Sequence, residues 1–221
     1  MSQIFDLTNS ASEADLAAAV SAAVAAVGNG GLVVIPTDTS YALICDAFNP
    51  DAVAALRSAK SQDQSVTIPV GAGNRATIDG IATFSELAHD LASAFWPGPL
   101  TVITHTQPSV SLAVKAEDAA SAVRIPNHPI AIAVLNAIGP VAMTGAQKVG
   151  GLPVLTIEQA KAEIGDDATI YIDNGKLTGS QSSVVVATGE NLRLVRAGTL
   201  SIEQLRTVVP TIINATASKK N

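Results

Sequence analysis

LVVIPTDTS, at residues 32–40, joins a short apolar run to a polar loop. Four consecutive apolar residues between glycine and proline are typical of a buried β-strand, and Pro36 ends this one. The loop that follows, residues 37–40, carries three hydroxyls and one carboxylate. Because polar loops after buried strands gather in one crevice of an α/β sheet, the stretch predicts both a fold class and the position of a site.

Helical and extended segments alternate along the rest of the chain. Capping residues and apolar spacing predict helices at 12–27, 49–60, 85–95, 129–138, 156–164 and 201–209. Strands are predicted at 32–35, 66–70, 100–104, 122–125, 141–144, 169–172, 183–187 and 192–195. The alternation predicts an α/β sheet, and the consecutive strands near the end predict a mixed one.

Size and charge limit the possible classes of protein. The chain has 221 residues, of which 48% are hydrophobic, enough to bury the core of one domain. We expect that domain over residues 1–214 and a disordered tail over 215–221. Only 14% of residues are charged and the formal net charge is −6, which disfavours binding of nucleic acid through a basic face.

The chain also lacks the marks of an exported or membrane protein. Cys45 is the single cysteine, so no internal disulfide can form. The N-terminus has no basic segment followed by an apolar one, and the Ala/Val-rich segment at 16–27 is too short to span a bilayer. We therefore expect a cytoplasmic protein without membrane association.

Polar side chains that could bind a ligand occur at four places. These are the loop 36–41, Lys60 with Arg57 at a helix end, Arg124 inside an apolar strand, and Ser182-Ser183 with Arg196 downstream. Cations and hydroxyls together suit a ligand that carries phosphate or carboxylate. Each place also has a structural interpretation: turn formation for the loop, interaction with the helix dipole for Lys60, and a buried ion pair for Arg124.

No metal site or generic nucleotide-binding loop is predicted. His89, His105 and His128 do not have the spacing of metal ligands. The chain contains no GxxxxGK[ST], no GxGxxG and no nucleophile elbow.

Four motifs occur in a fixed order: PTDTSYAL at 36–43, FWPGPLT at 95–101, VRIPNHP at 123–129 and VRAG at 195–198. They resemble the PTDTVYGL, WPGPLT, VRxPxHP and LRPG motifs of the YrdC-type threonylcarbamoyl-AMP synthase family. The resemblance covers residues 31–198 and implies a YrdC-like twisted, open mixed sheet with flanking helices and a large concave cavity.

The same resemblance implies an activity. Family members are nucleotidyltransferases that condense L-threonine, bicarbonate and ATP, with Mg²⁺ accompanying the ATP, into threonylcarbamoyl-adenylate for tRNA modification. Some members are also described as translation-factor-like and as binding double-stranded RNA.

Positions that match the family motifs imply roles for individual residues. Substrate contacts are implied at Thr39, Arg124, Thr144 and Ser182, and nucleotide contacts at Lys60, Gln62, Gly145 and Arg196. Within this set Lys60 and Arg124 are the implied catalytic cations. Arg124 would hold the threonine carboxylate, while Lys60 and Arg196 would face the phosphates of ATP.

The nucleotide side departs from the family pattern. The KxR motif is Lys60-Ser61-Gln62, so its Arg is a Gln. STSANxSG is MTGAQKVG at 143–150, so its Ser and Asn are Gly145 and Gln147, and STVVD is SSVVV at 182–186. Many members have a His after the strand that ends at Val70, and none follows here. Lys148 could act as a replacement cation.

Three hypotheses therefore stay open at this stage. The first is an active synthase with a remodelled ATP site, favoured by the retained cations and hydroxyls. The second is a non-catalytic relative that binds a nucleotide, a small metabolite or double-stranded RNA in the same cavity. The third is a protein–protein module with a vestigial pocket.

Overall fold

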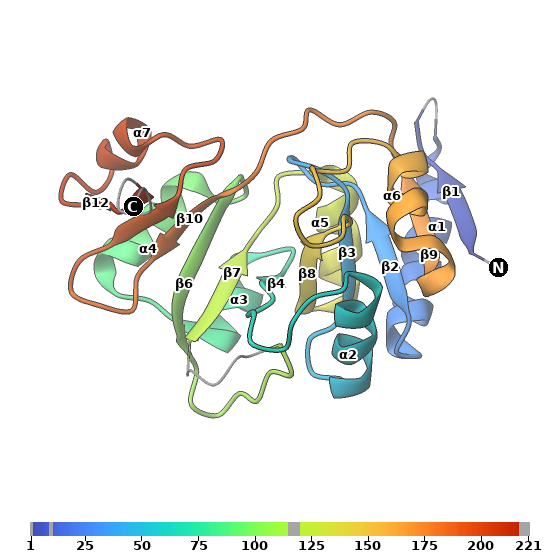
Figure 1. Cartoon of the computed structure of the whole chain (residues 1–221), viewed down its shortest axis with the longest axis horizontal. Helices are drawn as coiled ribbons and strands as arrows, with labels where there is room; N and C mark the ends of the chain where they lie inside the picture. The colour runs from blue at the N-terminus through green and yellow to red at the C-terminus, as the bar shows by residue number, and fades with distance from the viewer. Residues whose placement is uncertain (1, 9–10, 115–119, 217–221) are drawn as a thin grey trace.

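The computed structural model describes residues 2–8, 11–114 and 120–216. They form an α/β fold with one mixed β-sheet and helices around it (Figure 1). Its strands are β1 (Gln3–Asp6), β2 (Leu32–Ile35), β3 (Ala42–Asp46), β4 (Val70–Gly71), β5 (Ala82–Thr83), β6 (Leu100–Thr106), β7 (Ala120–Arg124), β8 (Val141–Gly145), β9 (Ala168–Asp173), β10 (Ser183–Val186), β11 (Arg193–Arg196) and β12 (Ile213–Asn214). The strand order is β1-β9-β2-β3-β8-β4-β7-β6-β10-β11-β12, with β5 paired to β6. Parallel pairs such as β2–β9 and antiparallel pairs such as β3–β8 confirm the predicted mixed sheet.

All of the described α-helices except α5 begin at a residue whose side chain caps the helix. They are α1 (Glu13–Gly28), α2 (Pro50–Ala59), α3 (Arg75–Ile81), α4 (Glu86–Phe95), α5 (Pro129–Ile138), α6 (Ile157–Ile164) and α7 (Ile202–Arg206). Ser12, Thr156 and Ser201 each form a complete capping box. Among the described residues, no helix has the length and apolar character needed to cross a membrane.

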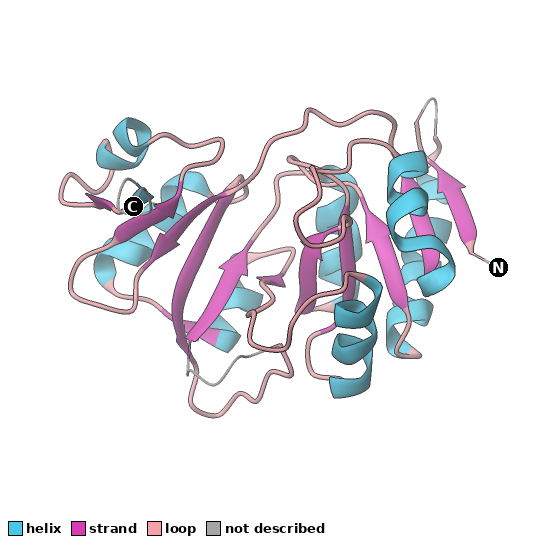
Figure 2. Cartoon of the chain, in the orientation of Figure 1, coloured by secondary structure: helices cyan, strands magenta, loops and turns pink. Residues whose placement is uncertain are grey.

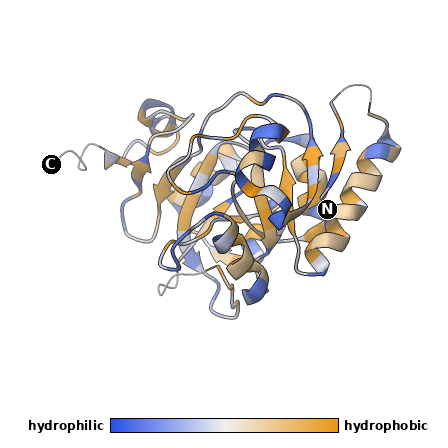
Figure 3. Cartoon of the chain, turned by 45° about the vertical axis from the view of Figure 1, so that its right-hand side comes forward, coloured by the Kyte–Doolittle hydropathy of each residue, from blue (hydrophilic) through white to orange (hydrophobic). Residues whose placement is uncertain are grey.

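Strand β2 shows how the sheet separates two hydrophobic cores. All four of its residues are buried. Leu32 and Val34 belong to the core that includes residues of α2 and α6, and Val33 and Ile35 to the core under α1 and α5. Since successive side chains of a strand point to opposite faces, a strand covered on both faces must be apolar throughout. Figure 3 shows the same pattern, with hydrophobic strands inside and hydrophilic residues on the outer parts of the helices.

Several elements differ from the sequence-based prediction. Strands β1 and β3 and helix α3 were not predicted, and the last helix ends at Arg206 rather than at residue 209. The predicted strand at 66–70 is wrong except for Val70. Arg57 explains part of this difference, because its Nη1 donates to the carbonyls of Asp63 at 2.8 Å and Val66 at 2.7 Å. The carbonyl of Val66 is thus bound by a side chain instead of a neighbouring strand.

The ends of the chain are only partly described. The N–H of Ala215 donates to the carbonyl of Leu194 at 2.9 Å, so the chain continues beside β11 to that point. Residues 217–221 of the predicted tail lie outside the described part.

Helix α2 ends in a left-handed turn that usually takes glycine. Ser61 has φ 52°, a conformation that no other non-glycine residue in the described ranges adopts. The N–H of Gln62 donates to Arg57 at 2.9 Å and that of Ser61 to Ser58 at 3.0 Å, the two bonds of a Schellman motif. This turn sets the path of the chain from Lys60 to Gln62.

We expect Ser61→Gly to stabilise the fold, because glycine adopts this φ without a steric penalty. The gain should be up to about 1 kcal/mol in the free energy of unfolding, measured by urea titration. Ser58→Gly is the matched control, since Ser58 is exposed inside the same helix and glycine there should destabilise. Equal effects of the two substitutions would contradict the assignment of strain to Ser61.

Candidate functional site

A cavity of about 180 Å³ is lined by residues of β3, β6, β7, β8 and β11 and of the loops beside them. In Figure 1, β2, β3 and β8 form one part of the sheet, and β4, β7, β6, β10 and β11 form another. Figure 2 shows the segment at 174–182 crossing between these parts without forming a helix or strand. The lining residues with polar side chains are Thr37, Thr39, Ser40, Thr101, Arg124, Thr144, Gln147, Ser180, Gln181, Ser182 and Arg196. Hydroxyls and two guanidinium groups therefore dominate the cavity, and no carboxylate is among the described residues that line it.

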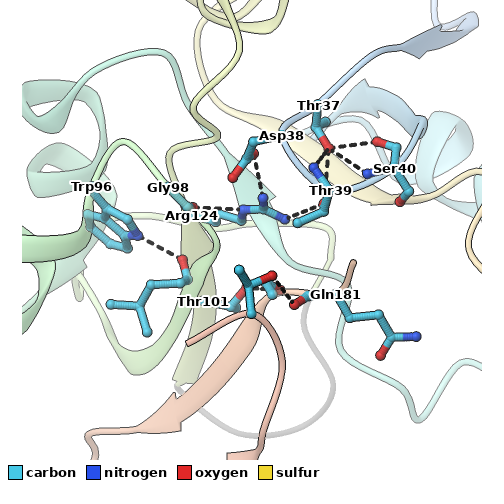
Figure 4. A network of polar contacts seen from close by, with 12 residues as sticks. Thr37, Asp38, Thr39, Ser40, Trp96, Gly98, Thr101, Arg124 and Gln181 are labelled. Atoms are coloured by element: carbon cyan, nitrogen blue, oxygen red, sulfur yellow. Dashed lines mark hydrogen bonds and ion pairs between the residues drawn. The ribbon is translucent and has the colours of Figure 1, made fainter. Parts of the chain in front are cut away.

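Arg124, at the end of β7, lies at the centre of the site with 7% of its surface exposed (Figure 4). Its Nη2 lies 2.6 Å from Oδ1 of Asp38, its Nε donates to Gly98 O at 3.2 Å, and its Nη1 donates to Thr39 Oγ1 at 3.3 Å. Burial lowers the pKa of Arg124 and the charge of Asp38 raises it. Of the two alternatives left open by the sequence, the structure shows that Arg124 forms the buried ion pair and also lines the cavity.

The loop after β2 is held in place by its own hydroxyls. Thr37 Oγ1 donates to Ser40 O at 2.6 Å and accepts from the N–H groups of Thr39 at 3.2 Å and Ser40 at 3.3 Å. Thr37 and Thr39 are both buried, and their Oγ1 atoms lie 3.1 Å apart. The hydroxyl of Thr39 is thus fixed between Thr37 and Arg124 before any ligand binds.

A second polar group lies across the cavity. Ser182 Oγ lies 2.9 Å from Thr101 Oγ1 and accepts from Nη2 of Arg196 at 2.9 Å. The Nε of Arg196 donates to the carbonyl of Ser182 at 3.0 Å. Arg196 therefore fixes both the side chain and the backbone of Ser182, although Arg196 itself is an exposed residue.

Lys60 and Gln62 do not belong to the cavity lining, although the resemblance placed both at the nucleotide. Lys60 is buried, and its Nζ donates to the carbonyls of Gly145 and Gln147. Gln62 Oε1 is buried without a hydrogen-bond partner among the described residues. Lys148, the possible replacement cation, is exposed, and its backbone N–H donates to Glu163 Oε2 at 3.0 Å.

The other candidate residues do come together. Thr39, Arg124, Thr144, Gly145, Ser182 and Arg196 all line the cavity. Sequence reasoning missed the roles of Asp38, Thr101 and Gln181. Asp38 and Thr101 stand inside the quoted motifs, but no pattern indicated that Asp38 pairs with Arg124 or that Thr101 contacts Ser182.

Burial of Lys60 has a measurable consequence. Burial lowers its pKa from 10.5 to about 8, and the charge of Glu163 opposes this shift. Below pH 8 both the folded and unfolded chains carry the proton, and between pH 8 and 10.5 the unfolded chain binds more of it. The free energy of unfolding of the wild type should therefore rise relative to that of Lys60→Met between these pH values. Denaturant titrations of both proteins at pH 7 and pH 10 measure this difference, and an unchanged difference would contradict a buried ammonium.

Comparisons with known proteins place the chain in a family. Residues 25–198 match the Sua5/YciO/YrdC family model, described as "Telomere recombination". A Mycobacterium tuberculosis H37Rv protein named "Putative threonylcarbamoyl-AMP synthase" is 36% identical over 189 residues, which cover 85% of this chain and 87% of that protein. The Bacillus subtilis threonylcarbamoyl-AMP synthase is 28% identical, and the match covers 86% of this chain and 56% of that protein. The chain belongs to the Sua5/YciO/YrdC family.

Solved structures agree with this assignment. P. abyssi Sua5 in complex with L-threonine has a TM-score of 0.90 and 25% identity, and the match covers 100% of this chain but 64% of Sua5. E. coli YciO has a TM-score of 0.83 and 23% identity over 93% of this chain and 100% of YciO. The expected YrdC-like twisted mixed sheet is confirmed.

Proposed function

We propose that this chain is a threonylcarbamoyl-AMP synthase, which condenses L-threonine, bicarbonate and ATP into threonylcarbamoyl-adenylate, pyrophosphate and water. The observation that carries the proposal is Arg124, a buried guanidinium beside the hydroxyl of Thr39 on the wall of a polar cavity. The L-threonine complex of a family member with the same fold supports the choice of amino acid.

Arg124 has the capacity to hold the threonine carboxylate. A guanidinium group has five N–H donors. The contacts of Arg124 with Gly98, Thr39 and Asp38 use three of them, one each on Nε, Nη1 and Nη2. The remaining two, one on each Nη, could bind the carboxylate. Since Asp38 and Gly98 already fix the guanidinium, little further ordering is needed when threonine binds.

The opposite wall suits an anionic group. Arg196 and the hydroxyls of Ser182 and Thr101 lie there, and positive charge beside a transferring phosphoryl group stabilises its transition state. In the balanced reaction the threonine nitrogen bonds to the bicarbonate carbon and water leaves. A carbamate oxygen then bonds to the α-phosphorus of ATP, and the bond from that phosphorus to pyrophosphate breaks.

Mg²⁺ would be bound mainly by the phosphates of ATP. The part of the chain that the structure describes contains no cluster of three or more His, Cys, Asp or Glu side chains placed to hold a metal ion. As far as the structure describes it, the cavity lining offers hydroxyls but no carboxylate. These residues do not form a protein metal site.

Pyrophosphate release tests the proposal. With ATP, Mg²⁺ and bicarbonate present, addition of L-threonine should start release by the wild type. Arg124→Lys keeps the charge but loses the fork of donors, so it should raise the KM for threonine. No threonine-dependent release, beside an active relative as control, would overturn the proposal.

A second candidate function is non-catalytic ligand binding in the same cavity. It is favoured by the absence of Lys60 and Gln62 from the lining, which removes two of the expected nucleotide contacts. A rise in melting temperature with ATP but no pyrophosphate release would support it. A role in tRNA modification, binding of double-stranded RNA and a cytoplasmic location stay predictions, and the net charge of −6 does not favour RNA.

A further inference from the structure

The turn that follows Thr144, residues 145–149, forms one end of the cavity wall. Gly145 and Gln147 both line the cavity. Lys60 holds the backbone of this turn, because its Nζ donates to the carbonyls of Gly145 and Gln147 while its own carbonyl accepts from the N–H of Val149 at 3.2 Å. The N–H of Ala146 donates to Tyr41 O at 2.9 Å. The turn is therefore fixed from two sides.

The side chain of Gln147 lies over Gly145. A Cβ atom at position 145 would lie 2.9 Å from both Cδ and Nε2 of Gln147, and closer still to Oε1. Real Cβ contacts are not this short, so a side chain at 145 and the amide of Gln147 in this position exclude each other. Gly145 and Gln147, which both depart from the family motif, are thus sterically matched to one another.

The amide oxygen of Gln147 lacks a donor. Its Oε1 is buried and has no hydrogen-bond partner among the described residues. The nearby ammonium of Lys60 donates to the backbone carbonyls of Gly145 and Gln147 and makes no hydrogen bond to this side-chain oxygen. A buried acceptor without a donor is unfavourable, so a ligand that supplies a donor there gains affinity.

We propose that Gln147 is a specificity-determining residue, whose amide oxygen accepts a hydrogen bond from a hydroxyl or amino group of the ligand, and that Gly145 leaves the space this amide needs. Such a donor could belong to the nucleotide or to the amino acid. The identity of the ligand rests on the proposed function, whereas the steric pairing of Gly145 with Gln147 does not.

Calorimetric titration of ATP and of L-threonine, each into the wild type and three variants, tests the proposal. Gln147→Leu keeps bulk but removes the acceptor, and Gly145→Ala displaces the amide. Each should weaken the affinity for the ligand that carries the donor about tenfold. The double variant should lose no more affinity than the single variant that binds more weakly, because both changes remove the same contact.

The two ligands distinguish the source of the donor. A loss for ATP alone assigns the donor to the nucleotide, and a loss for L-threonine alone assigns it to the amino acid. Gly28→Ala is the control, since a Cβ there would meet no atom within 4 Å, and it should bind as the wild type does. Thermal unfolding of each variant confirms that it is folded.

The proposal fails if Gln147→Leu binds both ligands as the wild type does, or if the losses of the two single variants add in the double variant. Failure of the proposed function looks different, because the wild type then binds its ligands but releases no pyrophosphate. If the wild type binds neither ATP nor L-threonine, both the proposed function and the proposed role of Gln147 are overturned.

Discussion

Arg124→Met should lower the free energy of unfolding by about 3–5 kcal/mol, because it leaves the carboxylate of Asp38 with no partner in a nearly closed environment. The side chains of Arg124 and Asp38 are 9% and 13% exposed, and Asp38 Oδ2 is buried with no hydrogen bond to the residues that the structure describes. Removing the cation therefore leaves the Asp38 carboxylate, which is already poorly solvated, without a charged partner. Urea titration of the wild type and the variant gives the difference.

The double variant Arg124→Met/Asp38→Leu is the control. Replacing both partners of a buried pair by apolar groups is often nearly neutral, so the double variant should recover most of the stability that the single variant loses. It should not recover threonine binding, because the guanidinium is absent. A single variant that costs less than about 1 kcal/mol, or a double variant no more stable than the single one, would contradict the role of this pair.

Gly198→Ala should lower both the stability of the fold and its affinity for ligand, because it displaces Ser182 from the cavity. A Cβ at 198 would lie 2.5 Å from the carbonyl carbon of Ser182, 2.7 Å from its oxygen, and closer still to Gln181 O. All three atoms are backbone, so no rotation of a side chain relieves the contact. We expect a cost of roughly 1–3 kcal/mol in stability, measured by thermal unfolding, together with weaker ligand binding.

Gly189→Ala is the matched control for this variant. A Cβ at 189 would meet no atom within 4 Å, and its φ lies outside the left-handed region. The same substitution there should change stability by less than about 1 kcal/mol and leave binding unchanged. If Gly198→Ala behaved like Gly189→Ala, the close packing of Gly198 against Ser182 would be refuted.

The sequence predicted those elements whose ends are determined by residues close in the chain, such as a proline or a glycine at a helix end. Helix α5 has the predicted bounds, Pro129–Ile138, because proline starts it and Gly139, with φ 100°, ends it. Strand β3 was not predicted; its partner β2 is close in the sequence, but its other partner, β8, lies far along the chain, as in the pairing of Ala42 with Gly145. The side chain of Arg57 binds the carbonyl of Val66, within the segment where a strand was expected, and the spacing of apolar residues does not indicate such a contact.

In the site, too, the motifs indicated which residues come together, but not the contacts that depend on the path of the chain. The motifs indicated that Thr39, Arg124 and Ser182 would meet in one cavity, and the structure brings them there. They could not indicate where the ammonium of Lys60 lies, because its acceptors are the carbonyls of Gly145 and Gln147, 85 and 87 residues away in the sequence. Pairing of Gly145 with Gln147 likewise depends on the path of the turn after Thr144.

One measurement tests the proposed activity most directly. The protein is incubated with ATP, Mg²⁺, L-threonine and ¹³C-labelled bicarbonate, and the products are separated and identified by mass spectrometry. We predict an adenylate that contains both the threonine and one labelled carbon, formed only when all the substrates are present. Absence of this labelled adenylate, while an active family member forms it under the same conditions, would contradict the proposal that this cavity makes threonylcarbamoyl-adenylate.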